Sequence, residues 1–97
     1  MHGRVRIFIP SLVGGLTFAG QGDLASGDKT VQAFFSPHEL GGIDIKELEG
    51  LLRAQAYLIL RFEPREEAVP FQKYEATLLT STLSVDALAC TFQLRAM

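Results

Sequence analysis

The sequence predicts an α+β domain: a mainly antiparallel sheet of five or six strands, with one principal helix packed on one face. Several segments alternate apolar and polar residues with the period of a strand, and one segment, 45–53, has the apolar period of a helix. The chain has 97 residues, of which 47% are apolar and 21% charged. These values are typical of a folded globular chain, so we expect a single domain over residues 1–97.

The helix is expected to begin after Asp44. Its carboxylate can accept amide hydrogens of the first turn, and Glu47 follows at the spacing of a capping box. The apolar residues that share one helical face are Ile45, Leu48, Leu51 and Leu52. Gly50 either costs about 1 kcal/mol relative to alanine or lets the helix approach a sheet closely.

The segment Ala56–Phe62 follows the helix and changes the period to two. Leu58 and Leu60 point one way, while Tyr57 and Ile59 point the other. Both faces carry apolar side chains, which predicts a central strand covered on both sides.

Three further strands are expected before the helix, which gives the order β-β-β-α-β-β-β. Residues 3–9 alternate, and residues 12–19 form a second short strand with a bulge or turn at Gly14–Gly15. A glycine-rich loop is expected over 20–28, and a third strand over 29–35. A single helical turn should then begin after Ser36, because proline follows at the first helical position.

After the helix and central strand, the sequence predicts a hairpin of Phe71–Leu83 with 87–94. Threonine, valine and phenylalanine favour strands there. The connection lacks glycine, so a helix capped by Ser84 within residues 83–94 is the alternative.

Charge and cysteine content restrict the class of partner and the compartment. The net charge is −2 and no basic run is visible, so we expect no nucleic-acid partner. The one cysteine, Cys90, excludes an internal disulfide and is expected to be an inert core thiol in a cytoplasmic protein. A secretory signal over 7–22 is the alternative location, and no apolar run reaches the ~18 residues of a membrane span.

No cofactor or metal is expected. The segment Gly22–Thr30 resembles a phosphate-binding loop, but Asp28 separates Gly27 from Lys29, and a strand rather than a helix follows. The acidic residues lack the spacing of a metal site.

For catalysis, His38 and Glu39 are the only candidates, and both are weak, because adjacent helical residues do not face each other.

The remaining candidate is a surface. The expected ligand or interface residues are Tyr57, Ile59, Arg61, Phe71 and Tyr74. Tyrosine and arginine are common at interface hot spots, and an uncovered apolar sheet face needs a partner.

We therefore expect a non-enzymatic binding or protein-interaction domain, homodimeric through a sheet face or edge, with a protein partner or a small apolar ligand. The alternatives are a small hydrolase- or isomerase-like enzyme that uses His38, and a regulatory or inhibitory protein. The latter would dock on a larger partner through the strand edge Phe71–Leu83.

Overall fold

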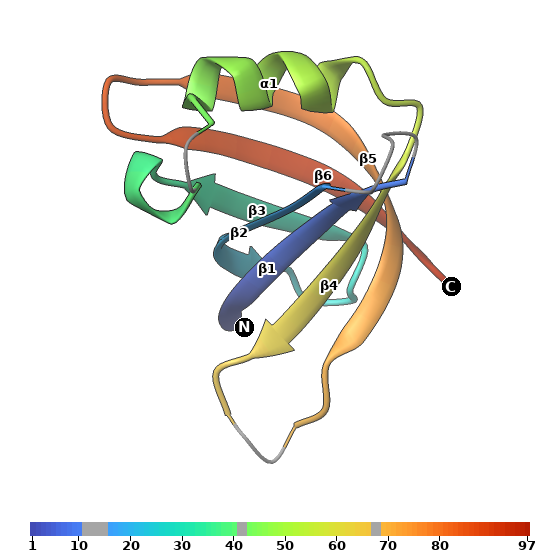
Figure 1. Cartoon of the computed structure of the whole chain (residues 1–97). Coiled ribbons are helices and arrows are strands. Elements are labelled where there is room, and N and C mark those ends of the chain that lie inside the picture. Colours follow the sequence, from blue (N-terminus) through green and yellow to red (C-terminus); the bar gives the residue numbers. More distant parts are fainter. Residues whose placement is uncertain (11–15, 41–42, 67–68) are drawn as a thin grey trace.

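A computed structural model describes residues 1–10, 16–40, 43–66 and 69–97. Its six strands form a closed antiparallel barrel in the order β1–β2–β3–β6–β5–β4 (Figure 1). The elements are β1 His2–Ile9, β2 Leu16–Leu24, β3 Thr30–Phe35, the 3-10 turn η1 Pro37–Glu39, α1 Ile45–Arg53, β4 Leu58–Pro64, β5 Gln72–Leu83 and β6 Leu88–Ala96. The order of strands and helix along the chain is as expected.

The predicted arrangement, an open sheet with a helix packed on one face, is wrong. β1 pairs with both β2 and β4, so the sheet closes on itself. The apolar residues on both sides of β4 suggested two covering layers. In the barrel, Leu58, Leu60 and Phe62 face the interior, while Ile59 and Arg61 face outward and are half-buried. All six strands share one core inside the barrel, so no second layer is needed to cover the outer side of β4.

The interior of the barrel is filled by side chains. β1, β3 and β4 alternate inward and outward, and their inward residues are buried. The largest fully buried side chains are Phe35, Phe62 and Phe92. A six-stranded barrel is narrow enough for such side chains to fill it. The filled interior leaves no room in the barrel for the small apolar ligand that we expected.

The loop expected over 20–28 is largely strand, because β2 continues to Leu24. Its glycines allow close packing. A Cβ atom on Gly20 would lie 2.5 Å from the carbonyl oxygen of Phe34, and one on Gly22 would meet the Val5 side chain. Glycine here permits backbone and core to approach, and does not mark a turn. The bend expected at Gly14–Gly15 lies outside the described residues.

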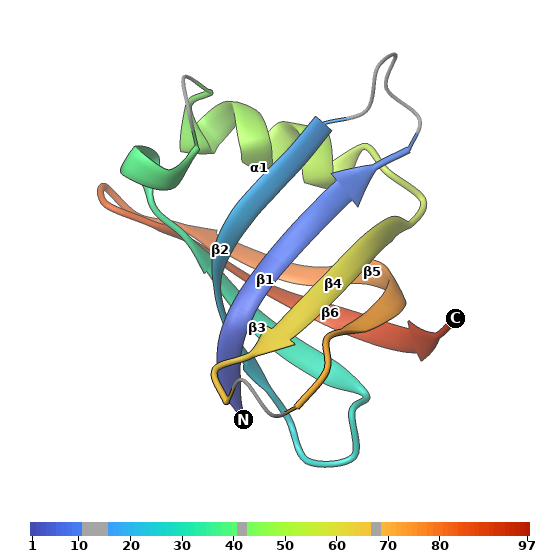
Figure 2. The same cartoon turned by 60° about the horizontal axis from the view of Figure 1, so that its bottom comes forward.

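The helix α1 covers one end of the barrel, where β1 ends and β4 begins (Figure 2). Asp44 caps it as expected, because its Oδ1 accepts the amide hydrogen of Lys46 at 3.1 Å. The residues of α1 that enter the core are Ile45, Leu48 and Leu52. Gly50 does not serve close packing, since a Cβ atom there would meet nothing within 4 Å.

The C-terminal hairpin is confirmed, and the alternative helix over 83–94 is wrong. β5 and β6 pair along their length. Ser84 closes the turn in place of glycine: its amide donates to the carbonyl of Ala87 at 2.9 Å, and its hydroxyl accepts from the amide of Ala87 at 3.2 Å. A serine side chain can supply the bonds of a tight turn.

Candidate functional site

The outer face of β1, β4 and the start of β5 gathers cations and aromatic rings. We call it the basic face. Its residues are Arg4, Arg6, Phe8, Ile59, Arg61, Glu63, Phe71, Lys73 and Glu75. The strands lie side by side in both views of the barrel (Figures 1 and 2). Four cations and two carboxylates give this face a charge of +2, although the whole chain has −2.

The central feature of the basic face is a row of three cations across three strands. Arg6 of β1 is the register partner of Arg61 of β4, and Arg61 is the register partner of Lys73 of β5. Like charges directly opposite each other destabilise a sheet. The row is therefore an electrostatic cost that folding alone does not explain.

One half-buried carboxylate, Glu63, offsets part of this cost. Its Oε1 atom lies 3.2 Å from Nε of Arg6 and 3.1 Å from Nε of Arg61. The Arg61 Nε atom is buried and, despite that short distance, has no hydrogen-bond partner of acceptable geometry among the described residues. Lys73 forms no ion pair with any residue that the structure describes. One carboxylate thus serves two arginines, and the third cation of the row stays unpaired.

Aromatic rings lie at both sides of the row. The guanidinium carbon of Arg61 is 3.8 Å from the centroid of the Phe71 ring, which is a cation–π contact. Phe71 is nevertheless 48% exposed. Phe8 lies two residues after Arg6, faces Ile59 across the strands, and is 38% exposed. Rings this exposed beside cations are available to a partner.

The structure brings together most of the predicted interface residues. Ile59, Arg61 and Phe71 belong to the basic face, and Tyr57 is exposed just before β4. Tyr74 is different: it lies inside the barrel, and its hydroxyl donates to Oε1 of Gln72. Burial raises the pKa of the Tyr74 hydroxyl, and the nearby Asp28 carboxylate adds to the effect.

Three residues of the basic face were not predicted as site residues: Arg6, Phe8 and Lys73. The sequence contains no run of basic residues, and the cations at positions 6, 61 and 73 meet only across strands. The available signal was the alternation of residues 3–9, which already placed Arg4, Arg6 and Phe8 together on one side of a strand.

The weak catalytic candidates are not assembled into a site. His38 and Glu39 are exposed on η1, and neither lines a main surface cavity formed by the described residues. The described residues also contain no cluster of three metal-ligating side chains. The geometry therefore gives no support to a base at His38.

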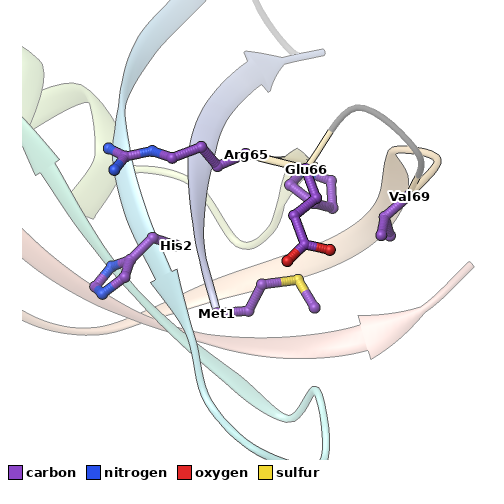
Figure 3. Close-up of a pocket in the computed structure, with 6 residues that line it drawn as sticks. Met1, His2, Arg65, Glu66 and Val69 are labelled. Atoms are coloured by element: carbon purple, nitrogen blue, oxygen red, sulfur yellow. The ribbon is translucent and has the colours of Figure 1, made fainter.

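A set of shallow cavities lies at the end of the barrel opposite α1. One has a volume of about 310 Å³ and is lined by Met1, His2, Pro64, Arg65, Glu66 and Val69. Figure 3 shows the His2 and Arg65 side chains extending to one side, away from Glu66 and Val69. The polar groups do not converge on a common point, as those of a ligand pocket do.

The strand edge expected over Phe71–Leu83 is mostly occupied. β4 pairs with β5 along Gln72–Ala76, and β6 pairs with it along 74–83. Beyond the reach of β4, α1 lies beside β5: the hydroxyl of Ser81 donates to Glu49 at 2.9 Å and accepts from Arg53 at 2.9 Å. This geometry leaves little edge for docking.

Cys90 is a buried thiol, as expected. Its pKa is raised to about 12, mainly by burial and also by the carboxylate of Glu49, while Arg53 opposes the shift. A thiol with so high a pKa is protonated at neutral pH and is a poor nucleophile.

Comparison of the chain with family models, with curated proteins and with solved structures found no match. Among the described residues, no helix has both the length and the apolar character needed to cross a membrane. The function is therefore argued from the geometry of the basic face.

Proposed function

We propose that the protein is a non-enzymatic binding domain that holds an anionic partner on the basic face. The observation that carries this proposal is the register of Arg6, Arg61 and Lys73, which places three cations directly opposite one another. An anionic group above the row would replace their repulsion by charge-assisted hydrogen bonds. The row then costs stability in the free protein and contributes affinity in the complex.

The charge distribution of the whole chain supports a functional origin for the row. The basic face has a charge of +2, which leaves −4 for the rest of the chain. A field of one sign on one side of a small domain steers charged partners toward it. Neutral polar residues at the same positions would serve the barrel at least as well.

A binding role fits the residues on this face better than catalysis does. The face offers cations and rings, which recognise charge and planar groups, and it has no acid–base pair placed to transfer a proton. Of its two carboxylates, Glu63 lies between Arg6 and Arg61 and forms an ion pair with each of them.

The homodimer expected from the sequence fits this face less well. A symmetric dimer places the same patch of both copies in contact. Here that would bring the Arg6–Arg61–Lys73 row of one copy against the row of its partner, and like charges across an interface are strongly unfavourable. Light scattering after gel filtration tests this directly, with a monomer as the expected result.

Heparin affinity chromatography tests the proposal, with Lys73→Gln as the variant. We expect the wild-type protein to be retained despite its net charge of −2, and the variant to elute at lower salt. Lys46→Gln is the matched control, because it removes the same charge from the exposed surface of α1. Its elution should stay close to that of the wild type.

Two results would contradict the proposal. Wild-type protein that passes through the column unretained would show that the basic face does not bind a polyanion. An equal shift for Lys46→Gln and Lys73→Gln would show that only total charge matters. Thermal unfolding of each variant checks that all of them are folded.

A further inference from the structure

The rings of the basic face add a second kind of contact to its charge. Phe8 and Phe71 are both exposed and lie on either side of the cationic row. From strand spacing and rise they are about 16 Å apart on a diagonal that crosses the row. A partner that follows this diagonal meets a ring, then the cations, then a second ring.

Accepting the proposed function, we infer that the anionic partner is single-stranded nucleic acid. Its phosphates would lie along the row Arg6–Arg61–Lys73, and two of its bases would stack on Phe8 and Phe71. Proteins that bind single strands combine a cationic path for the backbone with aromatic side chains for the bases. The guanidinium of Arg61, which already lies over the Phe71 ring, is itself a plane on which bases stack.

Other polyanions use only half of this surface. A sulfated polysaccharide or an acidic peptide would pair with the cations and leave Phe8 and Phe71 without a planar partner. A DNA duplex hides its bases, and its major groove, about 12 Å wide, admits a helix or a two-stranded ribbon but not the side of a barrel. The exposed rings therefore favour unpaired bases.

Fluorescence anisotropy with a labelled oligonucleotide of about ten thymidines is the test, since single-strand sites span roughly 4–16 nucleotides. We expect the wild-type protein to bind it more tightly than a duplex of equal length. Phe71→Leu should weaken binding at least about fivefold, because stacking of one base contributes this much or more. Phe8→Leu is a second variant of the same kind.

Phe34→Leu is the matched control. Phe34 is a ring of similar exposure, 45% against 48% for Phe71, but it lies on β3, opposite β4 in the strand order of the barrel. Its replacement should leave oligonucleotide affinity unchanged. For Lys73→Gln, the slope of log Kd against log salt concentration should become shallower by about 0.7, the value for one phosphate contact on a single strand.

Heparin retention separates this inference from the proposed function. Phe71→Leu should elute from heparin with the wild type while losing oligonucleotide affinity. The inference is overturned if the oligonucleotide does not bind, if Phe34→Leu weakens it as much as Phe71→Leu, or if only vesicles of anionic phospholipid bind. If heparin is still bound in those cases, the proposed function stands and only the inference is wrong. If neither heparin nor the oligonucleotide binds, both the inference and the proposed function are wrong.

Discussion

The side of α1 that faces β5 and the basic face arrange their charges in opposite ways. On α1, Glu49 and Arg53 are one helical turn apart, 3.7 Å from each other, and both bind the hydroxyl of Ser81. On the basic face, Arg6, Arg61 and Lys73 stand opposite one another, and the carboxylate of Glu63 pairs with the two arginines only. The first arrangement satisfies its charges within the fold. The second leaves cationic charge for a partner.

The difference separates a structural surface from a recognition surface. The i,i+4 pair of α1 is worth a few tenths of a kcal/mol at most and helps to hold the helix over the barrel end. The cationic row makes no such contribution, because its members repel one another. A surface that lowers the stability of the free protein points to a selected function more clearly than one that raises it.

The largest effect is expected from removing a core contact of α1. Leu48 is fully buried between the helix and the barrel. Leu48→Ala should lower the free energy of unfolding by about 2–5 kcal/mol, through lost burial and the cavity left behind. Urea denaturation measures it. A loss below about 1 kcal/mol would show that packing of α1 contributes little to the stability of the barrel. It would contradict the view that the charges of α1 serve the fold.

A smaller effect is expected from pH at the thiol beneath α1. The pKa of Cys90 is about 12 in the folded protein against an ordinary value of 9.0. Above pH 9.0 the unfolded chain releases this proton while the folded chain keeps it, so stability falls as pH rises toward about 12.

Between about pH 8 and pH 10, the contribution of Cys90 amounts to a loss of about 1 kcal/mol. Urea titrations at both pH values measure it, and Cys90→Ala should show a correspondingly smaller fall. Equal falls for both proteins would mean that the thiol ionises as readily in the folded state as in the unfolded state.

The shared carboxylate of the basic face gives a comparable effect. Glu63→Gln should lower the free energy of unfolding by about 1 kcal/mol at low salt, because Arg6 and Arg61 lose the carboxylate with which both form ion pairs. Higher salt should reduce the loss by screening the cations.

The double variant Glu63→Gln with Lys73→Gln should recover part of this stability, since one cation of the row is gone. A double variant less stable than Glu63→Gln alone would show that the row does not repel itself.

The smallest effect concerns the exposed side of α1. Gly50→Ala should raise the free energy of unfolding by up to about 1 kcal/mol, because the added methyl group meets no atom and glycine is a poor helix former. Heparin retention should not change. Destabilisation instead would show that Gly50 is needed for packing.

The local elements were largely predictable from the sequence, because they depend on neighbouring residues. Asp44 caps α1 through the amide of Lys46, and the alternation of residues 58–62 correctly indicated a strand. The closure of the barrel was not predictable in this way. It depends on pairing of β1 with β4, whose residues lie more than fifty positions apart, such as Arg6 with Arg61.

Most residues of the candidate site could not be predicted for the same reason, because they lie far apart along the chain. Arg61 and Phe71 were recognised from the outward side of one strand and the hypothesis of an interface. Arg6 and Lys73 carry no local signal of function, and only the register of three strands places them beside Arg61. The loop predicted at Gly20 and Gly22 was wrong for a related reason. These glycines make room for Phe34, Phe35 and Val5, which lie far from them in the sequence.

Nuclear magnetic resonance tests the central claim most directly, by titrating the ¹⁵N-labelled protein with a short heparin oligosaccharide and following its backbone amide signals. The account predicts that shifts concentrate on β1, β4 and the start of β5, around Arg6, Arg61 and Lys73, while the amides of α1 stay in place. Shifts centred on α1, or spread evenly over the barrel, would contradict it.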